Sequence, residues 1–157
     1  MKKKIFSFLI FLFLSSCGYE AIYSVKNRIN YSFLISELNL VGDRQVNLRI
    51  KQKLNSYSNP NSEEERKNFS LKISSNSEKI ITAKDASGDA TKFKNEITVS
   101  VKVFINKEYR SSFVITENFI YDNNSNTSEL RIYEGQIKNN LTGAAVDKII
   151  AKLALIL

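Results

Sequence analysis

One stretch of this sequence limits the possible fold more than any other. Between residues 97 and 105, apolar side chains occupy every second position, and polar or charged side chains lie between them. The apolar set is Ile97, Val99, Val101, Val103 and Ile105, and the other set includes Thr98, Ser100 and Lys102. A period of two places the sets on opposite faces of a β-strand. We therefore predict a sheet with one buried face and one polar face turned to water or to a partner.

The segment before residue 42 is also predicted to be a strand, with an irregularity. Its apolar side chains are Tyr31, Phe33, Ile35, Leu38 and Leu40. The first three share one parity and the last two share the other, so a regular strand cannot bury all five. The change of parity predicts a bulge near Ser36 and Glu37.

Two more strands are expected along the chain. One carries Phe69, Leu71 and Ile73, and the polar residues 74–79 are expected to interrupt it. The other covers residues 109–121 and follows the strand at 97–105 after a tight connection at Asn106-Lys107. Residues 85–91 are small and polar around Gly88, which predicts a turn or a hairpin tip.

Two amphipathic helices complete the pattern. Asp43 is a suitable N-cap for a helix that runs to about Tyr57, with an apolar stripe of Val46, Ile50, Leu54 and Tyr57. Asn126 and Glu129 resemble the capping box of a second helix. The apolar stripe of that helix is Leu130, Tyr133, Ile137, Leu141, Ala145, Ile149, Leu153 and Ile156. Gly135 and Gly143 inside the helix are expected to bend it or to allow close packing on the sheet. The order β-α-β-β-β-α predicts an α+β two-layer sandwich, in which two helices pack on one face of about four mostly antiparallel strands.

The first sixteen residues have the pattern of an export signal. Three lysines precede ten residues that are apolar except for Ser7, and ten residues make only ~15 Å of helix, about half of a membrane core. The following Leu14-Ser15-Ser16-Cys17 resembles a lipobox, in which the cysteine thiol receives diacylglycerol as a thioether before cleavage. We predict a signal peptide at residues 1–16, lipidation of Cys17, a tether at residues 17–30 and a single domain at residues 31–157. An ordinary secretory signal with a chance cysteine is the alternative.

The residue types exclude most catalytic chemistry. The chain has no His, which excludes His-dependent nucleophiles and zinc sites, and its only Cys is Cys17. Its five glycines form no phosphate-binding loop, and the acidic residues are scattered. An enzyme that uses carboxylates alone is the one catalytic alternative left. We expect no enzyme activity, no metal and no cofactor.

The basic character of the chain belongs partly to its signal. Loss of the three signal lysines lowers the formal net charge from +7 to about +4. Residues 84–94 carry Lys84, Lys92 and Lys94 with a single aromatic residue, too little for a nucleic-acid site, and we expect no nucleic-acid partner. The same lysines suit the phosphates of an anionic lipid such as lipopolysaccharide. The alternative is that they only keep a hairpin tip soluble.

The N-terminal half of the mature chain resembles the lipopolysaccharide-assembly lipoprotein (LptE) family. Cys17-Gly18-Tyr19 followed by Tyr23 is similar to the family's mature start, C-G-[FY]-x-P-[LV]-Y, although Ala21 replaces the proline. Asp43-Arg44-Gln45, Leu48-Arg49 and Leu54 resemble the family's first helix, and Pro60 lies where its helix-ending proline tends to be.

The C-terminal half continues the resemblance. Residues 82–94 and 99–104 are similar to the segment before the family's long third strand and to that strand, and residues 144–155 resemble its last helix. Residues 143–145 lack the acidic and arginine residues often found there. The order of these parts and the total length carry the resemblance.

The resemblance implies a lipid-anchored protein of the Gram-negative outer membrane, on the periplasmic side, with acyl chains such as palmitate on Cys17. Family members plug the lumen of the LptD β-barrel one to one, help to assemble it and assist delivery of lipopolysaccharide to the outer leaflet. Gly18 is not Asp, the residue associated with inner-membrane retention. Contacts with lipopolysaccharide are expected at Lys84, Lys92 and Lys94. An accessory lipoprotein subunit of another envelope transport or secretion complex is the alternative function.

Overall fold

A computed structural model describes residues 33–58 and 67–156, which belong to one compact unit. The elements are β1 (Phe33–Gly42), α2 (Arg44–Leu54), the short 3₁₀ helix η2 (Asn55–Tyr57), β2 (Lys67–Lys84), β3 (Ala90–Ile105), β4 (Glu108–Asp122) and α3 (Thr127–Leu155). The predicted signal, Cys17, the tether and Tyr31 lie outside the described residues.

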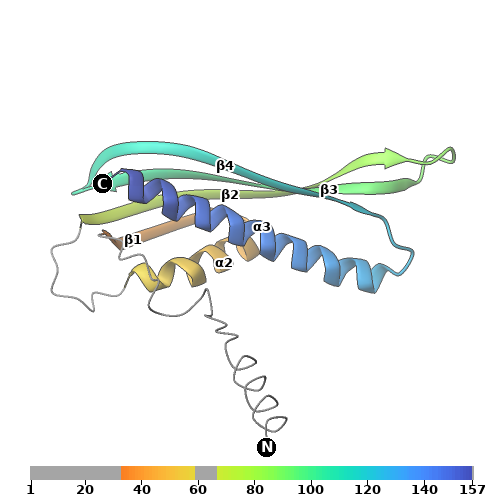
Figure 1. Cartoon of the computed structure of the whole chain (residues 1–157), viewed down its shortest axis with the longest axis horizontal. Coiled ribbons are helices and arrows are strands. Elements are labelled where there is room, and N and C mark those ends of the chain that lie inside the picture. The colour runs from red at the N-terminus through yellow and green to blue at the C-terminus, as the bar shows by residue number, and fades with distance from the viewer. Residues whose placement is uncertain (1–32, 59–66, 157) are drawn as a thin grey trace, which may run out of the picture. The chain divides into compact units, whose positions relative to one another are not determined.

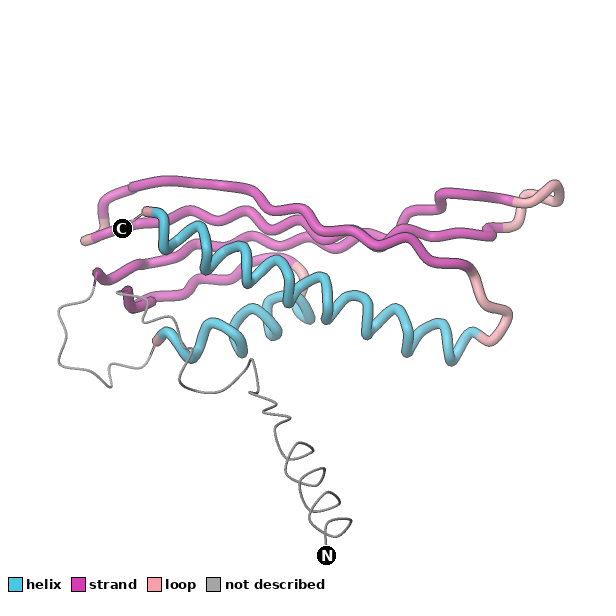
Figure 2. Tube along the Cα trace, in the orientation of Figure 1, coloured by secondary structure: helices cyan, strands magenta, loops and turns pink. Residues whose placement is uncertain are grey.

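The four strands form one sheet in the order β1-β2-β3-β4, and both helices cover the same face of it (Figure 1). β1 and β2 are parallel, with α2 as their crossover, and the other two pairings are antiparallel. Figure 2 shows the strands as one layer and the helices as a second layer. The predicted α+β two-layer sandwich is therefore confirmed, including its mostly antiparallel sheet.

β1 contains the predicted bulge. Its pairing with β2 shifts register between Ile35 and Glu37. Phe33 and Ile35 are buried before the shift, and Leu38 and Leu40 are half-buried after it. The extra residue thus turns both apolar sets toward the helices.

α2 begins at the predicted cap. The Asp43 carboxylate accepts hydrogen bonds from the N–H groups of Gln45 (2.9 Å) and Val46 (3.0 Å). Val46, Ile50 and Leu54 are fully buried and form the face that packs on the sheet. The α-helix ends at Leu54, earlier than expected, and η2 continues the chain to Tyr57.

The predicted interruption of β2 at residues 74–79 is wrong, because β2 stays paired with β3 through this stretch. Ser75 and Lys79, two of the polar residues that point toward the helices, find partners there. The Ser75 hydroxyl donates to the Asn47 side-chain oxygen of α2 at 2.8 Å, and the Lys79 ammonium donates to Glu134 of α3 at 2.6 Å. A strand can therefore remain regular where its inward side chains are polar, and the fully buried one, Ser75, is hydrogen-bonded.

β3 and β4 form the predicted hairpin. Asn106 and Lys107 have φ values of +53° and +67°, the left-handed pair expected of a tight two-residue turn. The alternation expected for β3 is confirmed, since Ile97, Val99, Val101 and Val103 are fully buried. Lys102 lies on the outward face of the sheet, which neither described helix covers; this face is mostly polar but also carries Phe104 and Val114.

α3 lies along the helix-covered face of the sheet and against α2. Asn126 caps it by accepting hydrogen bonds from Ser128 and Glu129, but its own N–H donates to Asn124, so the reciprocal half of a capping box is absent. The Lys138 ammonium binds the Asp43 carboxylate at 2.7 Å, and Lys53 donates to the Gly143 carbonyl at 3.3 Å. An added Cβ at Gly143 would meet only the end of the Lys53 side chain, at 3.4 Å, so the expected close packing at this glycine is not seen.

The core lies between the sheet and the two helices. Its largest fully buried side chains include Phe33, Phe69, Ile50, Leu71, Ile97, Ile149 and Leu153. Within residues 33–58 and 67–156, no helix combines the length and the apolar character needed to cross a membrane.

Candidate functional site

The β2–β3 hairpin extends beyond the first turn of α3 (Figure 1). Its turn is held by Asp85, whose carboxylate accepts hydrogen bonds from the N–H groups of Ser87 and Asp89, each at 2.9 Å. Gly88 supplies a φ of +91°, which L-residues rarely adopt. The predicted hairpin tip is therefore a hydrogen-bonded turn.

The structure places the three predicted lysines in this same hairpin. Lys84 ends β2, and Lys92 and Lys94 lie early in β3. The Lys92 ammonium binds Asp122 at 2.6 Å, and the Lys94 ammonium binds Glu96 at 2.8 Å. Lys84 is exposed and forms no ion pair with another described residue. Lys84 is therefore the lysine whose charge is most available to an anionic ligand.

A network beneath the hairpin fixes it to α3. Glu134 accepts hydrogen bonds from Lys79 of β2 at 2.6 Å and from the Tyr121 hydroxyl of β4 at 2.8 Å. The Lys79 ammonium also lies 3.8 Å from the centre of the Phe93 ring, a cation–π contact. The network joins three elements that are distant in sequence.

Tyr121 is the centre of this region. Burial raises its pKa above the ordinary value of 10.0, and the hydrogen bond to Glu134 and the charge of Glu134 act in the same direction. Its hydroxyl therefore stays protonated and keeps donating to Glu134 at physiological pH. Its ring packs edge-to-face on Tyr133, with 5.9 Å between centres, and against Phe93 at 5.8 Å.

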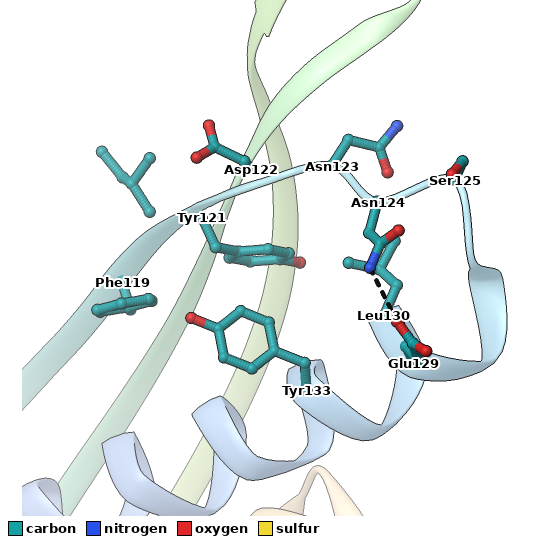
Figure 3. Close-up of a pocket in the computed structure, with 10 residues that line it drawn as sticks. Phe119, Tyr121, Asp122, Asn123, Asn124, Ser125, Glu129, Leu130 and Tyr133 are labelled. Carbon is teal, nitrogen blue, oxygen red and sulfur yellow. Dashed lines mark hydrogen bonds between the residues drawn. The ribbon is translucent and has the colours of Figure 1, made fainter.

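An open cleft of about 830 Å³ lies between the end of β4 and the start of α3 (Figure 3). We name it the distal pocket. Its lining includes Phe119 and Tyr121 of β4, Asn123, Asn124 and Ser125 of the connecting loop, and Glu129, Leu130 and Tyr133 of α3. This volume is within the range of ~300–1,000 Å³ that small-molecule sites occupy.

Aromatic rings form much of the wall of the distal pocket. The side chains of Phe119 and Tyr133 are 45% and 43% exposed, whereas Tyr121 is only 5% exposed. Figure 3 shows the Tyr133 ring beside that of Tyr121, with Phe119 on one side of them and the loop on the other. Phe119 and Tyr133 therefore offer ring surface to a ligand, and the Tyr121 ring packs against that of Tyr133.

The loop at residues 123–125 is held by its own hydrogen bonds. The Asn123 amide group donates to the Ala90 carbonyl at 2.8 Å, and its N–H donates to Thr91 at the same distance. The Asn124 amide group donates to Glu129 at 3.3 Å. This wall of the pocket is thus fixed to both β3 and α3.

Sequence reasoning did not find this pocket. It treated residues 122–126 as a loop and placed Tyr133 in the buried stripe of the last helix, whereas Tyr133 is largely exposed. The one available signal in the sequence was the large aromatic side chain of Tyr133 near the start of the last helix, for which the sequence offers no neighbour to bury its ring. Among the described residues, no group of three or more acidic or Cys side chains could hold a metal ion.

No model of a known protein family matches the chain, and no curated protein sequence matches it. Several solved structures share its fold. A minor lipoprotein from Acinetobacter baumannii has a TM-score of 0.57 and 10% identity, over 78% of this chain and 93% of that one. A rare lipoprotein B from Shewanella oneidensis has a TM-score of 0.52 and 15% identity, over 75% of this chain and 93% of that one.

A lipoprotein B from Nitrosomonas europaea has a TM-score of 0.57 and 14% identity, over 83% of this chain and 90% of that one. At such identities the likeness concerns the fold alone. The described domain therefore has a fold that occurs in bacterial lipoproteins.

Proposed function

We propose, from this lipoprotein fold, that the chain is an outer-membrane lipoprotein anchored through Cys17. In this proposal its domain fills the lumen of an LptD-like β-barrel one to one, helps the barrel to assemble and assists delivery of lipopolysaccharide to the outer leaflet. The sequence supports the anchor through the export signal and the lipobox that ends at Cys17. We propose a binding role rather than an enzymatic one.

The observation that carries the proposal is the polar face of the sheet. Both helices pack on the other face, so the side chains of Ser74, Asn76, Thr98, Ser100, Lys102 and Thr116 remain on the outward side. Val114, which pairs with Ser100, is an exposed apolar residue among them. The lumen of a large outer-membrane barrel is polar and contains water. A folded domain with a broad polar face is suited to such a lumen, where its side chains can exchange hydrogen bonds with the wall.

Lipid anchoring supports the same role. Two or three acyl chains hold a protein stably to a membrane, whereas one chain holds it only marginally. An anchored plug remains at high effective concentration near a barrel that folds in the same membrane. Replacement of Cys17 by Ser is therefore expected to reduce barrel assembly even though the domain still folds.

The test is purification of a C-terminally tagged chain from outer membranes. The proposal expects an LptD-like barrel to co-purify in equimolar amount, and expects less barrel with Cys17→Ser. Co-purification of a different envelope transport or secretion complex in place of the barrel would support the accessory-subunit alternative and refute the plug.

The lysines of the hairpin tip are the proposed contacts for lipopolysaccharide. Charge reversal at Lys84, Lys92 and Lys94 is expected to weaken capture of lipopolysaccharide by the purified protein. The largest single effect is expected at Lys84, because its charge has no ion-pair partner within residues 33–58 and 67–156, whereas Lys92 and Lys94 each have one. Lys102→Glu is the matched control, since Lys102 is exposed on the same face of β3 but distant from the tip. Equal binding by all four variants and the unaltered protein refutes these contacts.

A further inference from the structure

We propose that the distal pocket binds a saccharide: a neutral sugar ring that stacks on Phe119 and Tyr133 and donates hydroxyl hydrogen bonds to the loop and to α3. The inference goes beyond the proposed function and does not require a barrel partner. It rests on the shape of the pocket, on its exposed rings and on the kind of hydrogen-bonding atoms left free in it.

The charge of the pocket disfavours an anionic ligand. Asp122 and Glu129 contribute carboxylates, and none of the described residues that line the pocket is Lys or Arg. The nearby Lys92 ammonium is already bound to Asp122. A phosphate or carboxylate ligand would meet repulsion without a free cation to offset it.

The pocket contains hydrogen-bonding atoms that are left free. Glu129 uses one carboxylate oxygen for Asn124 and keeps a second oxygen without a partner among the described residues. The Asp122 side chain points away from the Tyr121 ring (Figure 3) and binds Lys92, so its carboxylate is not counted with them. The hydroxyls of Ser125 and Tyr133 also form no hydrogen bond to another described residue. These groups suit a ligand with several hydroxyl groups, which both donate and accept hydrogen bonds. A purely apolar ligand would cover these oxygens without forming hydrogen bonds to them, which costs free energy.

A sugar ring matches both properties of the wall. Its hydroxyl groups are donors around the rim, and one of its faces carries a row of C–H bonds with slight positive charge. That face packs against the negative face of an aromatic ring. Two exposed rings and a rim of hydrogen-bonding groups in about 830 Å³ leave space for more than one sugar unit.

Part of the pocket wall is already held in place without a ligand. Tyr121 is held by Glu134 and supports the Tyr133 ring, and Asn123 and Asn124 are held by Ala90 and Glu129. Little conformational entropy remains to be lost when a sugar binds, which favours affinity for a weakly interacting ligand.

Two envelope polymers present such sugars. One source is the core oligosaccharide of lipopolysaccharide, and the other is the glycan strand of peptidoglycan. The experiment titrates the purified full-length mature protein with two probes: a dephosphorylated core oligosaccharide freed from lipid A, and a disaccharide of peptidoglycan. Amide NMR shifts report the site, and tetramethylammonium serves as a cationic competitor for the rings.

The expected result is saturable binding in the millimolar range, with shifts concentrated at residues 119–133. Phe119→Ala and Tyr133→Ala are each expected to weaken binding about fivefold or more, and Tyr133→Phe to retain most of it because the ring remains. Tyr109→Ala is the matched control, since Tyr109 is an exposed aromatic residue at the other end of β4. Spectra of each variant establish that it is folded.

Binding of either probe with this pattern supports the proposal, and the probe that binds identifies the source. The proposal is overturned if neither probe shifts these residues up to its solubility limit, or if only tetramethylammonium does. It is also overturned if Tyr109→Ala weakens binding as much as the two pocket variants do. None of these results depends on whether a barrel co-purifies.

Discussion

Replacement of Gly42 by Ala is expected to destabilise the domain severely, because Gly42 has no room for a side chain. Its φ is +106°, and an added Cβ would lie 1.9 Å from the Ser75 carbonyl oxygen and 2.9 Å from the Ser75 carbonyl carbon. Both are backbone atoms of the neighbouring strand. One backbone or the other must therefore move.

The movement would disturb the junction of β1, β2 and α2. Gly42 and Ser75 form the last pair of the parallel ladder, and the Ser75 carbonyl also accepts the Asp43 N–H at 3.1 Å. Asp43 in turn caps α2. The left-handed backbone costs about 1–3 kcal/mol for a residue other than Gly, and overpacking adds about 1–3 kcal/mol. The expected loss is roughly 2–6 kcal/mol, a large fraction of an ordinary domain's ~5–15 kcal/mol.

Gly88→Ala is the matched control. Gly88 has a similar φ of +91°, but no atom lies within 4 Å of the position of its added Cβ. Only the conformational cost remains there, the same about 1–3 kcal/mol as at Gly42. Urea denaturation followed by circular dichroism measures both variants, and an unchanged m-value shows that stability alone has altered. If Gly42→Ala costs no more than Gly88→Ala, the steric argument is wrong.

Three further predictions concern the elements around the site. The pKa of Asp43 is below its ordinary value of 3.8; burial acts to raise it, but the hydrogen bond and charge of Lys138 and the N–H groups of α2 outweigh burial. The stabilisation that this charge supplies is therefore present above about pH 4 and is lost as pH falls through the lowered pKa. Asp43→Asn should be less stable than the unaltered protein near neutral pH, and the difference should shrink in urea titrations at about pH 3; a difference independent of pH contradicts this. Gly135→Ala should raise the unfolding free energy by about 0.5–1 kcal/mol, because no atom lies within 4 Å of the added Cβ and Ala favours the helix; a fall in thermal midpoint would show a constraint at this position. Tyr121→Phe should cost about 1 kcal/mol in the same urea assay, since it removes the hydrogen bond to Glu134 but keeps the ring, and no loss would mean that Lys79 alone satisfies Glu134.

The elements that the sequence predicted well depend on near neighbours. The Asp43 side chain caps α2 through residues two and three positions away, and the bulge in β1 follows from a change of parity within a few residues. The apolar side chains that alternate along residues 97–103 are buried as soon as one face of the sheet is covered, whatever covers it. These features recur in any fold that covers one face of the sheet, which is why they can be read from the chain.

The polar stretch in β2 shows where such reasoning fails. From the sequence, residues 74–79 resemble an interruption, because no partner for their side chains is near in the chain. Ser75 finds Asn47, 28 residues earlier, and Lys79 finds Glu134, 55 residues later. Burial of a polar group is decided by hydrogen bonds that exist only after the helices have packed.

The candidate site also has one part that the sequence predicted and another that depends on the tertiary structure. The sequence by itself determined that Lys84, Lys92 and Lys94 belong to one hairpin, because a turn at residues 85–89 must place its two flanking segments side by side. Only the tertiary structure decided that Lys92 is bound by Asp122, which the register of β3 and β4 places opposite it. Only the tertiary structure brings Phe119 and Tyr133 to one pocket, because a strand and a helix on either side of a loop meet only when both pack on the same core.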